Sequence, residues 1–353
     1  MKCFRGWGVI VLSALGACQP HSVRAVETQT RVSPDQAPVV LEQLIPAPGV
    51  VFLVQIRAAR LLAHQITTSS WESVLSSSRL AAYKRTTGLA LDAIDELWIV
   101  GYPLGTLVLF DAHSCGPQVE RAFVDQASSV AEQRDETHGS TFITGVISGE
   151  PQALYHRHGD FVAIAHGDIA LAKIVRGYAE GQLTAKSALQ TQFLAPLARL
   201  SPSALVRVFL VGPFEHATDA VAHGFAAGFV GIAPLDHELN LSVVARGLWG
   251  EQASSPLSTW LHSFLNTREA RAVGLGFPLA RPDVACAPER PASKPEGMAL
   301  TQCQTSLRYD SAALAQAVYR ITQAPGEELL AEDAPRGWRS LLLGEPEQPA
   351  TDP

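Results

Sequence analysis

The histidine pair His156 and His158 is the feature of this sequence best suited to chemistry. The residues before the pair read as a short strand, and side chains two positions apart on a strand project from one face. Asp160 follows nearby as a third donor, and two imidazoles with a carboxylate are ligands that zinc accepts. The other interpretation is the solvated end of a hairpin, because the sequence shows no further cluster of ligands around the pair. Both interpretations stay open at this point.

Two further patterns begin like functional motifs and have structural explanations. His237-Glu238 opens like a zinc-protease motif, but the second histidine that the motif requires four residues after the first is Leu241 here. The segment also alternates like a strand. The phrase His-Gly-Asp occurs at 158–160 and 166–168, where turn and helix-cap chemistry explain it without a ligand.

Signatures of the common enzyme classes are missing from the sequence. It contains no Gly-x-Ser-x-Gly elbow, no Ser-x-x-Lys pair, no phosphate loop and no Cys-x-x-Cys, and Gly274-x-Gly276 lacks the third glycine of a dinucleotide fingerprint. A triad assembled from distant residues stays open. We therefore assign no catalytic, cofactor-binding or metal-ligating residue, and we expect no cofactor.

The composition limits the kinds of protein that this chain can be. Of its 353 residues, 47% are hydrophobic, which excludes a mainly disordered chain. The formal net charge of −7 without a basic block argues against a nucleic-acid partner. Only 17% of the residues are charged and the mean hydropathy is slightly positive, which is apolar for a soluble ectodomain. That apolar surface is either core between sheets and helices or, in part, a groove for lipid or a partner protein.

Strand-like and helical stretches alternate along the chain. Apolar, β-branched runs predict strands at 50–56, 97–101, 105–110, 140–147, 152–156, 161–165, 205–211, 225–232, 238–248, 271–277 and 299–308. Apolar spacing and capping residues predict helices at 70–88, 116–130, 168–181, 190–200, 255–265 and from 310 onward. We expect Pro234 and Asp236 to turn the long hairpin. Strand groups interrupted by helices favour an α+β fold, with antiparallel or mixed sheets covered by helices in two similar halves, 39–183 and 184–324.

The N-terminus is organised like an export signal. A cationic start and an apolar core too short to span a bilayer precede Leu15-Gly16-Ala17-Cys18. This run resembles the lipobox of bacterial lipoproteins. The resemblance implies that residues 1–17 are a signal peptide, that the Cys18 thiol takes a diacylglycerol, and that its new amine is acylated, as by palmitate. The alternative is an ordinary secretory signal that is cleaved after Ala17.

The same resemblance places the protein in the bacterial cell envelope. Several acyl chains hold a protein on a membrane almost permanently, so the chain needs no transmembrane helix. Gln19 stands where an Asp would imply retention in the inner membrane, which favours the outer membrane and the periplasm. We expect residues 18–38 to be a flexible tether, and residues 325–353 to be a disordered acidic, proline-rich tail.

Three cysteines remain after the signal and the lipid-bearing cysteine are set aside. In an oxidising compartment, we expect Cys286 to pair with Cys303, because the two flank a proline-rich excursion whose closure stabilises by roughly 3 kcal/mol. Cys115 is then the odd thiol. It is either buried as a small hydrophobic side chain or paired with another chain.

The order of elements also resembles a bacterial envelope family that is catalogued as a domain of unknown function. The resemblance rests on Thr87-Gly88-Leu89 before one strand and on His158-Gly159-Asp160 before another, and it implies no catalytic or binding residue. We expect a membrane-anchored envelope lipoprotein with a non-catalytic binding or scaffold ectodomain, whose partner is an unknown envelope protein or an apolar ligand. The alternative is an envelope hydrolase without a recognisable motif.

Overall fold

The structure is a computed structural model, and it describes residues 40–64, 77–112, 115–135, 138–184, 187–212, 224–235, 238–249, 253–266, 276, 278–289 and 300–313. The described residues form two compact units. Unit 1 contains those up to Thr191, and unit 2 contains those from Gln192 onward. The segment before the boundary at Thr191 contacts the start of unit 1. There, the Ser187 hydroxyl donates a hydrogen bond to the carbonyl of Glu42, 2.6 Å away.

Unit 1 is built on an antiparallel sheet of seven described strands in the order β1-β2-β3-β7-β6-β5-β4. Most neighbours in this sheet are joined by short hairpins, and all its strands except β4 were predicted from apolar and alternating segments of the sequence. The strands are β1 (Phe52–Ile56), β2 (Leu97–Tyr102), β3 (Gly105–Asp111), β4 (Val130–Asp135), β5 (Ser140–Ile147), β6 (Glu150–Arg157) and β7 (Phe161–His166).

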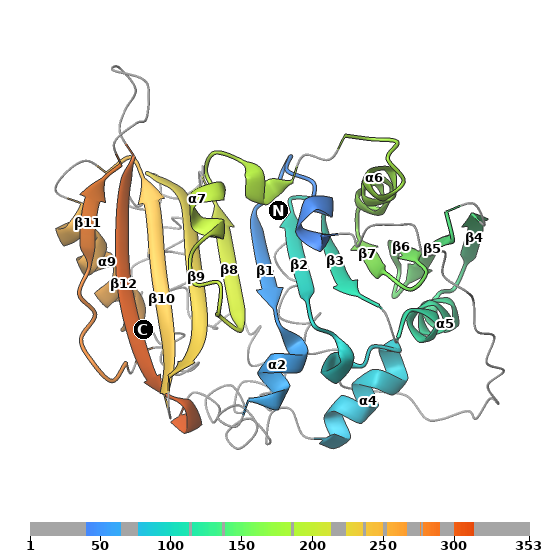
Figure 1. Cartoon of the computed structure of the whole chain (residues 1–353), viewed down its shortest axis with the longest axis horizontal. Coiled ribbons are helices and arrows are strands. Elements are labelled where there is room, and N and C mark those ends of the chain that lie inside the picture. Colours follow the sequence, from blue (N-terminus) through green and yellow to red (C-terminus); the bar gives the residue numbers. More distant parts are fainter. Residues whose placement is uncertain are drawn as a thin grey trace, which may run out of the picture. The chain divides into compact units, whose positions relative to one another are not determined.

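Helices lie against both faces of this sheet. Neighbouring residues of β6 show the two faces, since Leu154 joins a core cluster with α5 while the Tyr155 hydroxyl donates to Glu180 at the end of α6. In Figure 1, strands β5 to β7 lie between α5 and α6. The helical segments of unit 1 are η2 (Leu41–Leu44), α2 (Ala58–Ala63), α4 (Ser77–Thr87), η3 (Leu91–Ala93), α5 (Gly116–Gln126), α6 (Ala170–Ala179) and η4 (Ala188–Gln190).

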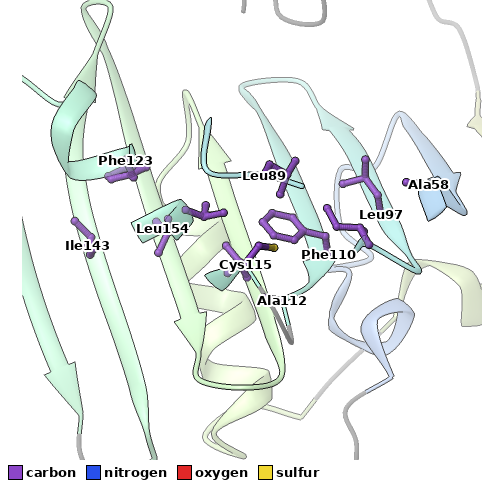
Figure 2. Packing of buried hydrophobic residues seen from close by; sticks show 12 residues of the cluster. Ala58, Leu89, Leu97, Phe110, Ala112, Cys115, Phe123, Ile143 and Leu154 are labelled. Atoms are coloured by element: carbon purple, nitrogen blue, oxygen red, sulfur yellow. The ribbon is translucent and has the colours of Figure 1, made fainter. Parts of the chain in front are cut away.

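The core of unit 1 on the α5 side is a continuous cluster of buried side chains. It draws on the start of α2, the hairpin β2–β3, helix α5 and the central strands. Cys115 is buried in this cluster, as Figure 2 shows, and its thiol is free. The buried members are Ala58, Leu89, Ile94, Leu97, Phe110, Ala112, Cys115, Val119, Phe123, Ile143, Leu154 and Val162.

Unit 2 has an antiparallel sheet of five described strands in the order β11-β12-β10-β9-β8. Helix α9 packs Leu261 and Leu265, one turn apart, against Leu241 and Tyr309 of this sheet. The elements are α7 (Ala195–Ala198), β8 (Val206–Val211), β9 (Phe225–Leu235), β10 (Glu238–Gly247), α9 (Ser254–Leu265), β11 (Ala285–Pro288) and β12 (Thr301–Asp310).

Two buried arginines tie other segments to this sheet. Arg207 on β8 donates to the carbonyl of Ala198, and Arg246 on β10 donates to the carbonyl of Phe193 and to both carboxylate oxygens of Glu289. A buried cation is expensive unless it is paired and hydrogen-bonded, so these contacts make the arginines compatible with the interior.

The fold class is α+β, with both units combining antiparallel sheets and helices. Three local expectations were wrong. The helix expected at 190–200 is reduced to α7, because Pro196 lacks an N–H and is tolerated only in the first turn of a helix, and because Ser201 adopts a φ of 44°. Val130 belongs to strand β4 and pairs with Gly145, because the chain is already extended at Ala127.

Pro234 is the third correction, since it lies within β9 rather than in a turn. It pairs with Leu239 of β10, while β8 reaches only as far as Ile232 along the other side of β9. At Pro234 the strand therefore has one neighbour, and the missing N–H of proline is tolerated. Asp236, the strand expected at 271–277 and most of the helix expected from Asp310 onward lie outside the described residues, apart from Gly276 and Ser311–Ala313.

No helix among the described residues is long and apolar enough to cross a membrane. The signal, the tether and the tail predicted from the sequence all lie outside the described residues.

Candidate functional site

Three side chains that bear metal-ligating atoms meet where α5 crosses the end of β6. Nδ1 of His156 lies 2.5 Å from Oε1 of Glu120, and Nε2 of His158 lies 3.6 Å from the same oxygen. One donor atom from each of the three residues lies within 4.8 Å of the other two. The imidazole rings of His156 and His158 are 4.7 Å apart between centroids. We call Glu120, His156 and His158 the His–Glu cluster.

The start of helix α5 brings Glu120 over the sheet. Pro117 occupies the first turn, where a missing N–H costs nothing, and Val119 and Phe123 anchor the helix in the core. Gly116 lies directly against His156, so a Cβ at this position would collide with Nε2 and Cε1 of the ring. The absence of a side chain at Gly116 therefore allows α5 to approach β6 closely enough for Glu120 to reach His156.

The cluster is graded from buried to accessible. The side chain of His156 is 2% exposed, that of Glu120 17% and that of His158 32%. Burial raises the pKa of the Glu120 carboxyl, but hydrogen bonds from His156 and His158 and the charges of the two rings outweigh it and lower the pKa to about 2. Glu120 is therefore a carboxylate at neutral pH.

A hydroxyl completes the surroundings of His158 but does not form a catalytic triad. Oγ1 of Thr141, which is fully buried, lies 2.9 Å from Nε2 of His158. In a triad, the base holds the nucleophile on one ring nitrogen and the carboxylate on the other. Here Thr141 and Glu120 both approach Nε2, so the arrangement does not relay a proton from a nucleophile to a carboxylate.

From the sequence, His156 and His158 were expected on one face of a strand with Asp160 nearby, and no metal-ligating residue was assigned. His156 and His158 come together as expected, but the carboxylate beside them is Glu120, while Asp160 lies 3.5 Å from Nε of Arg157. The tight turn at 158–160 directs Asp160 back toward Arg157. The sequence does place an acidic residue, Glu120, immediately after Val119 on the apolar stripe of α5. A carboxylate that is partly buried there is expected to have a hydrogen-bond or ion-pair partner.

A second group of donors in unit 1 consists of Asp135, His138 and Glu180. Its carboxylates are already paired, because Arg176 lies 2.9 Å from Glu180 and 3.6 Å from Asp135. The side chain of Glu180 is 1% exposed and also accepts hydrogen bonds from the hydroxyls of two neighbours, Ser140 and Tyr155. This group is a satisfied ion-pair network around a buried carboxylate.

Other residues that drew attention in the sequence have structural roles or lie outside the description. Glu238 begins strand β10, and His237 lies outside the described residues. Asp168 accepts a hydrogen bond from the backbone N–H of Ala170 at the start of α6, as a capping residue does. Cys18 lies outside the described residues.

The cysteines of unit 2 lie on neighbouring strands. Cys286 of β11 is directly opposite Cys303 of β12, and the two sulfurs are joined in a disulfide. The bridge fixes the short edge strand β11 to the rest of the sheet.

Comparisons with known proteins give a loose structural likeness. No protein-family model matches the chain, and no curated protein matches its sequence. Solved structures of crystal forms III, IV and I of TP0453 match with TM-scores of 0.45, 0.44 and 0.42 at 8%, 9% and 8% identity. They cover 82%, 80% and 81% of this chain and 100%, 97% and 99% of their own. A likeness at this level carries no statement about function.

Proposed function

We propose that this protein is a lipid-anchored component of the bacterial cell envelope, acylated on Cys18, with a non-catalytic ectodomain that binds or scaffolds an envelope partner. The observation that carries the proposal is the Cys286–Cys303 disulfide. Structural disulfides persist in oxidising compartments outside the cytoplasm, and the sequence ahead of the described residues reads as an export signal that ends in a lipobox. The two features agree on export.

Two structural observations support a binding or scaffold role over catalysis. The hydroxyl of Thr141, which contacts His158, is fully buried and shares a ring nitrogen with the carboxylate. In addition, the apolar faces of the described sheets are used as core against α5 in unit 1 and α9 in unit 2. This packing accounts for the apolar composition and favours a protein partner over an apolar ligand.

The experiment is expression of the full chain and of Cys18→Ala in a Gram-negative host, followed by fractionation and mass spectrometry of the N-terminal peptide. We expect the wild type in the outer-membrane fraction with an acylated cysteine, and Cys18→Ala as an unprocessed precursor or a released protein. Cys3→Ala is the matched control, because Cys3 belongs to the predicted signal and its loss leaves the lipobox intact.

Unchanged maturation and membrane association of Cys18→Ala would overturn the anchor. Native mass spectrometry of the wild type then tests the ligand: a co-purifying lipid would replace the scaffold proposal with a carrier for apolar molecules. An empty chain agrees with the scaffold proposal.

A further inference from the structure

We propose that Glu120, His156 and His158 form a binding site for a divalent transition-metal ion of the zinc class. The inference concerns unit 1 alone and does not depend on how the chain is anchored. It starts from the histidine pair of the sequence and from the carboxylate that the fold adds to it.

The donor set has the right chemistry. Two neutral imidazoles and one carboxylate are a ligand combination of zinc sites that keep a fourth position open, and imidazole also suits copper and nickel. Calcium and magnesium prefer sites made of oxygen atoms alone, so they fit this set poorly.

One donor distance in the cluster fits a tetrahedral site, and a second is shorter. Bonds of 2.0–2.2 Å to nitrogen and oxygen place the ligand atoms of a tetrahedral zinc ion about 3.3 Å apart. Nε2 of His158 is 3.6 Å from Oε1 of Glu120, which agrees with this spacing, and Nδ1 of His156 is closer at 2.5 Å. To admit an ion, the Glu120 carboxylate has to move away from Nδ1 of His156.

The site has a rigid side and an accessible side. His156 is fixed by the core and by Gly116, while His158 is about one-third exposed, so an ion reaches the cluster from solvent past His158. Nε2 of His156 is buried without a hydrogen-bond partner among the described residues. An ion at the site takes the place of two contacts, the one between Nδ1 of His156 and Glu120 and the one between Nε2 of His158 and Thr141.

The second donor group in unit 1 serves as an internal comparison. Around Asp135, His138 and Glu180, the positive charge is already provided by Arg176, which lies within 4 Å of both carboxylates. A metal ion there would face the guanidinium and would have to displace it. Among the described residues, no arginine or lysine forms an ion pair with the His–Glu cluster, and Arg134 interacts with Glu120 only through its charge. The two groups therefore predict opposite behaviour toward zinc.

The test uses the full chain, purified in detergent from whole cells without a histidine tag and stripped with EDTA. Zinc bound after dialysis is counted by elemental mass spectrometry, and its affinity is measured by competition with a chromophoric chelator. We expect one zinc ion per chain, and visible absorption bands of four-coordinate Co²⁺ when cobalt replaces zinc. His158→Gln and Glu120→Gln should each weaken zinc binding by at least about tenfold.

Matched controls keep the result interpretable. His138→Gln removes the histidine of the second group and His262→Gln removes a partly exposed histidine of unit 2, and both should bind zinc like the wild type. Substitution of His156, which is buried, risks misfolding, so His158→Gln and Glu120→Gln carry the test, with folding verified by circular dichroism. Thermal unfolding gives a second readout, because saturating zinc should raise the Tm of the wild type and leave that of His158→Gln unchanged.

Three results would overturn the site: no stoichiometric zinc in the wild type, unchanged affinity in the two cluster variants, or loss of binding in His138→Gln. Since none of these measurements depends on Cys18, failure of the metal site and failure of the lipid anchor are separately visible.

Discussion

At the scale of single residues, the missing side chain of Gly116 determines whether the His–Glu cluster forms. A Cβ added there would meet the His156 ring far inside van der Waals contact, and the ring is held by the core of unit 1. We predict that Gly116→Ala lowers the free energy of unfolding by about 1–3 kcal/mol, the usual cost of overpacking a filled interior. The loss should be visible as a lower urea midpoint.

Gln118→Ala is the control for this prediction, because Gln118 is exposed on the same turn of α5 and its replacement changes helix propensity without crowding the ring. Alanine is intrinsically a better helix residue than glycine. A neutral or stabilising effect of Gly116→Ala would therefore show that His156 does not lie against the helix, and the position of Glu120 over the ring would be wrong with it.

At the scale of elements, β11 is a short edge strand whose attachment depends on one covalent bond. Its four residues, Ala285–Pro288, pair with β12, and Cys286 is bonded to Cys303 over a sequence separation of 17. Removing a crosslink of this span costs roughly 3 kcal/mol in the chain-entropy account. We predict that Cys286→Ser with Cys303→Ser lowers the unfolding free energy by this order and raises hydrogen exchange in β11 and β12.

The control for the disulfide is Cys115→Ser, which removes the free thiol of unit 1 and leaves the bridge intact. If hydrogen exchange in the double variant rises in unit 1 and stays unchanged in β11 and β12, the prediction is contradicted.

Elements with strong local patterns were predictable from the sequence. The hairpin β2–β3, the strands β5 to β7 and the helices α5, α6 and α9 all follow from alternation, capping and apolar spacing read over a few residues. Edge strand β4 was missed because nearly all of its side chains are exposed and five of its six residues are not large apolar ones, so it carries no alternation. Strand β4 forms by pairing with β5, and the residues of β4 alone carry no pattern that predicts this pairing.

The candidate site was half predictable for the same reason. His156 and His158 are two residues apart, so strand geometry alone places them together. Glu120 is 36 residues away from His156, and its approach depends on α5 crossing β6 at Gly116. Asp160 looked nearer in the sequence, but the turn that contains it directs its carboxylate to Arg157. Proximity along the chain therefore favoured the wrong carboxylate.

At the scale of the whole molecule, the five cysteines of the sequence test the proposed processing in one measurement. Under the proposed processing, Cys3 leaves with the signal and Cys18 carries lipid. In the structure, Cys286 and Cys303 are bonded, and Cys115 is free and buried. Burial raises the pKa of the Cys115 thiol, which lowers its thiolate fraction as well as its access to reagents. The native protein should therefore react slowly with a thiol reagent.

Denaturation of the membrane-derived protein should release one reactive thiol, that of Cys115, and denaturation with reduction should release three, because Cys286 and Cys303 are added. Each departure identifies a different error. Two and four thiols would mean that Cys18 is not acylated, three and five would mean that the signal is also retained, and three under both conditions would mean that the disulfide is absent in the cell. Fast reaction of a single thiol before denaturation would mean that Cys115 is not enclosed by the core cluster around Phe110, and the packing of α5 against the sheet would have to be revised.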